Sequence, residues 1–180
     1  DNKLKKSVIE ADIINADGQA VVWAANLLGH NIPERVAGID LMEKLIEMSC
    51  MNNYKCYFLG SRENVVQKLV SIYKKKYSEK IIAGYRNGYF VEEEEESIAK
   101  KISESGANIL FVAISSPKKE IFLNKYKHHL SSVNFIMGVG GSFDVVAGKV
   151  KRAPKWMQNF GLEWFYRFYQ EPKRMWRRYL

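Results

Sequence analysis

Asp17 is a carboxylate at a position where it could act as a general base. Asp17 follows the short apolar run Ala11–Asn15 and precedes a helical pattern that starts near Gln19. A carboxylate there can cap the helix by accepting backbone N–H groups, or it can take a proton from an attacking hydroxyl. The pattern leaves both interpretations open.

Two glycine-rich turns also follow apolar runs. Gly60-Ser61 comes after residues 55–59, and Gly138-Val139-Gly140-Gly141-Ser142-Phe143-Asp144 comes after residues 134–137. Glycine lets the backbone approach a ligand closely, and such turns before helices bind phosphates. Neither turn has the spacing of a P-loop or of a G-x-G-x-x-G fingerprint, which argues against a P-loop NTPase and an NAD dehydrogenase.

Positively charged residues lie in two other predicted loops. Lys118, Lys119 and Glu120 follow the apolar run 108–113, and Arg35 lies in a predicted loop between two helices. These cations are either solvated surface charges or ligands of a phosphate or diphosphate, with Arg35 as a bidentate donor.

The elements that would position these residues alternate between strands and helices. Short apolar runs predict strands at 11–15, 55–59, 80–83, 108–113 and 134–138. Helical patterns occupy about 3–9, 18–28, 39–52, 62–76, 92–105 and 117–129, and the acidic run 92–96 suits a helix start. This alternation predicts an α/β fold, a Rossmann-like, mostly parallel sheet flanked by helices, with its ligands beyond the carboxyl ends of the strands.

The formal net charge of +8 is concentrated at one end of the chain. Residues 149–180 hold nine Lys or Arg, two Glu and three of the four Trp. We therefore expect two domains, 1–148 and a helical appendage at 149–180. Its large apolar residues fall at helical spacing, with a junction at Gly161; they are Trp156, Phe160, Trp164, Phe165, Phe168 and Tyr169.

Three interpretations of this appendage remain open. It could be an interfacial membrane element, a helical appendage with its aromatics in a core, or a nucleic-acid module, for which the chain shows no recognisable motif. The chain has no run of about 18 apolar residues that would predict a membrane span. Because no charged-then-apolar leader follows Asp1, we expect no signal peptide. Cys50 and Cys56 are expected to be reduced core thiols of a cytosolic protein.

Taken together and in order, these segments resemble the WecG/TagA/CpsF glycosyltransferase family. The matching pieces are Ala11–Gly18 with Val21–Trp23, Pro33–Gly38, Phe58–Ser61, Gly84–Phe90, Ser116–Glu120, Gly138–Asp144, Arg152–Pro154, Gly161–Trp164 and Glu171–Pro172. Members of the family usually have more chain before this start, and a glutamine where this chain has Lys119.

The resemblance, strongest to the TagA branch, implies an inverting hexosyltransferase of wall teichoic acid synthesis. The donor would be UDP-N-acetylmannosamine and the acceptor undecaprenyl-diphosphate-linked N-acetylglucosamine, at the inner face of the bacterial cell membrane. A related transferase using UDP-ManNAcA or a UDP-hexose, or an incomplete fragment that binds nucleotide-sugar or anionic lipid, stays open. We expect no metal, no cofactor and no nucleic acid, and self-association through the exposed aromatics where no membrane is present.

The same resemblance assigns roles to individual residues. Asp17 would be the catalytic base and Arg35 a cleft arginine, while Arg167, Arg174 and Arg177 of the appendage would meet the lipid diphosphate. The residues expected to bind substrate are Asn15, Gly18, Gly60, Ser61, Arg86, Lys119, Glu120, Gly138, Gly140, Gly141, Ser142 and Asp144.

Overall fold

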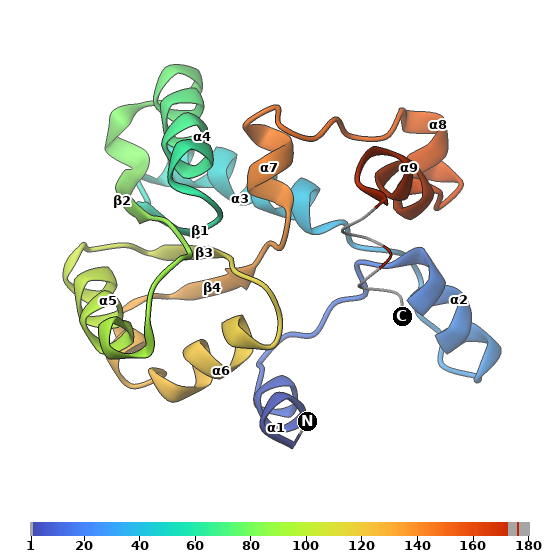
Figure 1. Cartoon of the computed structure of the whole chain (residues 1–180), viewed down its shortest axis with the longest axis horizontal. Coiled ribbons are helices and arrows are strands. Elements are labelled where there is room, and N and C mark those ends of the chain that lie inside the picture. Colours follow the sequence, from blue (N-terminus) through green and yellow to red (C-terminus); the bar gives the residue numbers. More distant parts are fainter. Residues whose placement is uncertain (1, 173–175, 177–180) are drawn as a thin grey trace. The chain divides into compact units, whose positions relative to one another are not determined.

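A computed structural model describes residues 2–172 and 176 (Figure 1). The chain forms two compact units. The first contains the residues up to Ile14 and Gly38–Ala147, and the second contains Asn15–Ala37 and the residues from Gly148 on. The C-terminal segment, which we expected to follow a domain of residues 1–148, thus clusters with residues 15–37.

The first unit is built on a four-stranded, all-parallel sheet. Its strands are β1 (Cys56–Gly60), β2 (Ile82–Arg86), β3 (Ile109–Ala113) and β4 (Phe135–Gly138), in the order β2-β1-β3-β4. The α/β fold and the strands predicted at 55–59, 108–113 and 134–138 are confirmed. The strand predicted at 80–83 instead runs from Ile82 to Arg86, because Glu79–Ile81 form a 3-10 turn. Leu59 pairs with Arg86, Gly60 with Ala113, and Val112 with Gly138, so the strands end at one edge of the sheet.

Helices cover both faces of this sheet. They are α3 (Gly38–Asn52), α4 (Glu63–Lys76), α5 (Glu92–Glu104), α6 (Lys118–Lys125) and α7 (Ser142–Val146), with α1 (Asn2–Ile9) packed on α6. Side chains alternate between the two faces of a strand. Phe58 and Phe111 therefore join a core with α3, α4 and α7, whereas Leu59 and Leu110 join a core with α5 and α6.

The predicted strand at 11–15 is wrong. These residues form no strand in the structure, and Ile13 and Ile14 are 73% and 69% exposed. A strand is stabilised by hydrogen bonds to a neighbouring strand, and an apolar run in the sequence does not reveal whether a neighbour exists.

The end of one helix differs from expectation, and one short helix was not expected. The helix predicted at 117–129 ends at Lys125 and is followed by a short 3-10 turn at His129–Ser132. Tyr126 and Leu130 are buried beyond its end, so the apolar spacing continues where the α-helix does not. The turn after β4 leads directly into α7, which we did not expect.

The second unit contains α2 (Gln19–Leu27), α8 (Lys155–Asn159) and α9 (Glu163–Gln170). The predicted junction at Gly161 is confirmed. Its φ is +70°, and a Cβ there would collide with Cγ of Gln19, so the turn between α8 and α9 lies against the start of α2. None of the helices described is both long and apolar enough to cross a bilayer.

Candidate active site

The turns after β1, β2 and β3 are tied together at the carboxyl edge of the sheet. Gly60 has φ +133°, and an added Cβ would lie 2.5 Å from the backbone carbonyl of Ala113. Ser61 follows in the left-handed region (φ 56°), where its N–H donates to Ala113 O at 3.0 Å and its carbonyl accepts from Gly88 N at 2.9 Å. This edge is therefore set by backbone contacts that only glycine at position 60 permits.

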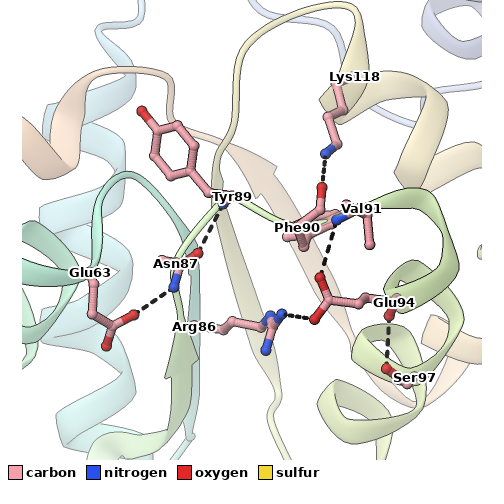
Figure 2. Close-up of polar contacts among 9 residues, drawn as sticks. All are labelled: Glu63, Arg86, Asn87, Tyr89, Phe90, Val91, Glu94, Ser97 and Lys118. Carbon is pink, nitrogen blue, oxygen red and sulfur yellow. Dashed lines mark hydrogen bonds and ion pairs between the residues drawn. The ribbon is translucent and has the colours of Figure 1, made fainter.

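Arg86 ends β2 and is held by the start of α5 (Figure 2). Its Nη2 donates to Glu94 Oε1 at 2.7 Å, while Glu94 Oε2 accepts the N–H of Val91 at 3.1 Å. The guanidinium also lies 6.0 Å from the centre of the Phe90 ring. Arg86 is thus positioned by a carboxylate and an aromatic face before any ligand binds.

The segment after Arg86 is fixed from two further helices (Figure 2). Asn87 Nδ2 donates to Glu63 at 2.7 Å, and its Oδ1 accepts the N–H of Tyr89 at 3.0 Å. Lys118 Nζ donates to Phe90 O at 2.7 Å. Lys118, which we considered as a phosphate ligand, therefore has a structural contact that the sequence did not indicate.

Lys119 lies over the backbone of the glycine-rich turn. A Cβ at Gly138 would fall 2.7 Å from Lys119 Nζ, and the ammonium pairs with Glu120 Oε1 at 3.0 Å. Burial raises the pKa of the Glu120 carboxyl. The Lys119 hydrogen bond and charge, together with hydrogen bonds from the Glu120 backbone N–H and from Ser116, outweigh this effect and leave that pKa below its usual range. The structure therefore brings Lys119, Glu120 and Gly138 together.

Within the Gly138–Asp144 segment, only part of the turn faces solvent. Gly138 and Gly140 are exposed, and Gly140 has φ +50° with open space where a Cβ would be. Ser142 and Asp144 are buried in α7, and Ser142 Oγ donates to Val139 O at 2.7 Å. The backbone of the glycines is thus the accessible part of the expected phosphate-binding turn.

In the second unit, the Asp17 segment is hydrogen-bonded to the Arg35 segment. Val36 N–H donates to Ala16 O at 3.0 Å, and Asn15 Nδ2 donates to Val36 O at 3.3 Å. The N-cap of α2 is Gly18, so Asp17 stands one residue before the cap position. Asn15, Asp17 and Gly18 are exposed. The expected base and the expected cleft arginine therefore lie on adjacent, hydrogen-bonded backbone segments.

Arg35 is held by a carboxylate from the appendage. Its Nη1 lies 2.5 Å from Glu163 Oε2, and Arg152 Nε lies 3.4 Å from Glu163 Oε1. The side chains of Arg35 and Glu163 are only 15% and 25% exposed. Glu163 and Arg152 were not expected as partners of Arg35, because sequence spacing does not show which distant charges come into contact.

The appendage presents its aromatic side chains to solvent. Five of the six predicted stripe residues are at least half exposed, namely Trp156, Phe160, Trp164, Phe165 and Tyr169. These five rings therefore do not form a buried core. Arg167 pairs with Glu171 at 3.7 Å, whereas Arg174 and Arg177 lie outside the described residues.

The expected site residues belong to both units. Of the expected site residues that the structure describes, Asn15, Asp17, Gly18, Arg35 and Arg167 are in the second unit, and the others are in the first. Among the residues that the structure describes, no three His, Cys, Asp or Glu side chains form a cluster suited to a metal ion.

An all-parallel sheet with helices on both faces is an open α/β arrangement, and the glycine turns and cations lie at its carboxyl edge, where ligands of such proteins bind. Residues 1–180 match the profile of the Glycosyl transferase WecG/TagA/CpsF family, and the chain belongs to that family. The chain is similar to an N-acetylglucosaminyldiphosphoundecaprenol N-acetyl-beta-D-mannosaminyltransferase of Bacillus spizizenii (strain ATCC 23059 / NRRL B-14472 / W23), with 38% identity over 170 residues.

A relative with the same name in Bacillus subtilis (strain 168) is 35% identical over 170 residues. In both cases the alignment covers 94% of this chain and 65% of the relative. The chain thus spans about two thirds of the length of these curated relatives.

Proposed function

We propose that the chain is an inverting glycosyltransferase that moves N-acetylmannosamine from UDP-N-acetylmannosamine to N-acetylglucosamine on undecaprenyl diphosphate. The family membership and the names of the two relatives support the reaction. The observation that carries the proposal is the pair of hydrogen bonds joining the Asn15–Asp17 segment to Val36, next to Arg35. It places a carboxylate and a guanidinium on neighbouring segments.

In this reaction Asp17 is the base. Its carboxylate takes the proton of the acceptor hydroxyl, whose oxygen forms the new bond to C1 of the donor sugar. The bond from C1 to the diphosphate breaks on the opposite face, and UDP leaves with the electron pair. Positive charge from Arg35 and backbone N–H groups stabilises the charge that develops on a diphosphate. The glycine turns of the first unit are proposed to bind the nucleotide.

The test is sugar transfer by the full chain to a short-chain prenyl-diphosphate acceptor. Asp17→Asn should lower kcat by about 10²- to 10⁴-fold, the usual contribution of a general base. UDP affinity should stay within about twofold, since the proton transfer step is what is removed. Asp12→Asn is the matched control, because Asp12 is also an exposed aspartate of this segment. Transfer at the parent rate by Asp17→Asn would refute the assignment.

The donor is tested separately with a panel of UDP-sugars. UDP-N-acetylmannosamine should give the highest kcat/KM, because both relatives are named for its sugar. Preference for UDP-N-acetylmannosaminuronic acid or for a UDP-hexose would keep the family and change the substrate.

We further propose that the chain is a peripheral protein of the inner membrane face, bound through the exposed rings of α8 and α9. Trp164→Ser with Phe165→Ser should reduce sedimentation with anionic phospholipid vesicles several-fold. Tyr54→Ser, which removes an exposed aromatic from the first unit, is the control and should bind vesicles like the parent. Equal binding by the double variant and the parent would contradict this membrane surface.

A further inference from the structure

Glu163 has no role in the proposed reaction, yet its carboxylate contacts two arginines. It is the first residue of α9, where the helix dipole favours a carboxylate. Each of its two oxygens meets a different arginine, Oε2 with Arg35 Nη1 at 2.5 Å and Oε1 with Arg152 Nε at 3.4 Å. One carboxylate therefore connects the loop that carries Arg35 with the segment that leads into α8.

These three side chains are shielded from solvent. Arg35 is 15% exposed, Glu163 25% and Arg152 28%. Ion pairs that are partly removed from water are screened less than surface pairs, and they restrict the side chains they join. The three groups carry a formal charge of +1 in total, so the single carboxylate does not neutralise both arginines.

The ion pair with Glu163 engages one nitrogen of the Arg35 guanidinium. Arginine has five N–H donors in a rigid fork, and the ion pair with Glu163 is made through Nη1. A carboxylate on one corner fixes the plane of the fork and thus the direction in which the remaining donors point. An arginine that is oriented beforehand loses less side-chain freedom when it binds its ligand.

We propose that Glu163 is a positioning residue that orients Arg35 toward a diphosphate. The inference rests on the proposed function, in which Arg35 meets a substrate diphosphate. That diphosphate belongs either to the nucleotide-sugar donor or to the lipid-linked acceptor, since both carry the same group. The appendage thereby contributes to the chemistry through a carboxylate as well as through its cations.

The experiment is a double-mutant cycle in the full chain. Glu163→Gln keeps the shape of the side chain and removes its charge. It should lower kcat/KM about tenfold when Arg35 is present and change it by less than about twofold in the Arg35→Ala background. Equal losses in both backgrounds would show a structural role and overturn the inference. Unchanged or higher activity of Glu163→Gln would overturn it too, because the carboxylate would then be neutral or a competitor of the substrate.

Separate KM values identify the ligand. If Arg35 meets the donor, Glu163→Gln raises the KM for UDP-sugar; if it meets the acceptor, the variant raises the KM for the prenyl diphosphate. Glu163→Asp, which retains the charge, should lose less activity than Glu163→Gln. Glu34→Gln removes the same charge at the exposed neighbour of Arg35 and should behave like the parent within about twofold.

Two further measurements keep the result unambiguous. Circular dichroism is used to find a temperature at which all variants are folded, and the rates of sugar transfer are compared at that temperature. The affinities for UDP and for a short prenyl diphosphate are measured by calorimetry on the same four proteins of the cycle. If the Glu163→Gln and Arg35→Ala substitutions are coupled in binding but the parent transfers no sugar, the proposed function is refuted and the inference is retained. If the two substitutions are coupled neither in binding nor in sugar transfer, the inference is refuted.

Discussion

The carboxyl edge of the sheet depends on the absence of a side chain at Gly60, and Gly60→Ala tests this directly. The residue has φ +133°, and its added Cβ would lie 2.5 Å from both the carbonyl carbon and the oxygen of Ala113. These are backbone atoms of β3, which pairs with β1 at this position. The clash can be relieved only by moving one strand relative to the other.

The magnitude follows from two contributions. A non-glycine residue in a sparsely populated backbone region costs about 1–3 kcal/mol. Forcing an extra carbon into a packed site costs about 1–3 kcal/mol more. We therefore expect Gly60→Ala to lower the free energy of unfolding by about 2–6 kcal/mol, a large part of the 5–15 kcal/mol of a typical domain.

Gly106→Ala is the matched control. Gly106 also has a positive φ (+70°), but nothing lies within 4 Å of its added Cβ. Only backbone strain remains there, so the expected loss is about 1–2 kcal/mol. Urea denaturation followed by circular dichroism measures both variants. If Gly60→Ala lost no more stability than Gly106→Ala, the contact with Ala113 would not constrain this edge.

Three further predictions concern the first unit. Phe58→Ala should lower the free energy of unfolding by about 3–5 kcal/mol in urea denaturation, because the ring is fully buried; a loss below about 1 kcal/mol would contradict this core. Burial raises the pKa of the Cys56 thiol to about 11, so at pH 8 only about one in a thousand of these groups is a thiolate. Iodoacetamide should modify Cys50 first in the folded protein and both cysteines in urea, and equal native rates would refute this. The Val91 N–H and Arg86 hold the pKa of Glu94 below its usual range, so its contribution to stability is complete above the ordinary glutamate pKa and is lost as the pH falls through the lowered value. Arg86→Gln should raise the Glu94 pKa in an NMR titration, and an unchanged value would exclude this contact.

Local chemistry made much of the fold predictable. Strands β1, β3 and β4 are short apolar runs bounded by turns, and α5 begins at the acidic run because carboxylates stabilise a helix start. The break at Gly161 was also predictable, since glycine adopts φ +70° without strain. The glycine turns and Lys119 were expected at the carboxyl edge, because parallel strands place their ends together.

The sequence by itself determined the features that each segment encodes locally. These are strand and helix propensity, the position of turns and the charge of the appendage. Tertiary structure alone decided that residues 11–15 form no strand, since pairing requires a neighbour that an apolar run does not specify. It also decided that Glu163 pairs with Arg35 and that Glu94 holds Arg86. Charges of opposite sign are numerous along this chain, and only the folded backbone brings particular ones within a few ångströms of each other, where their attraction becomes strong.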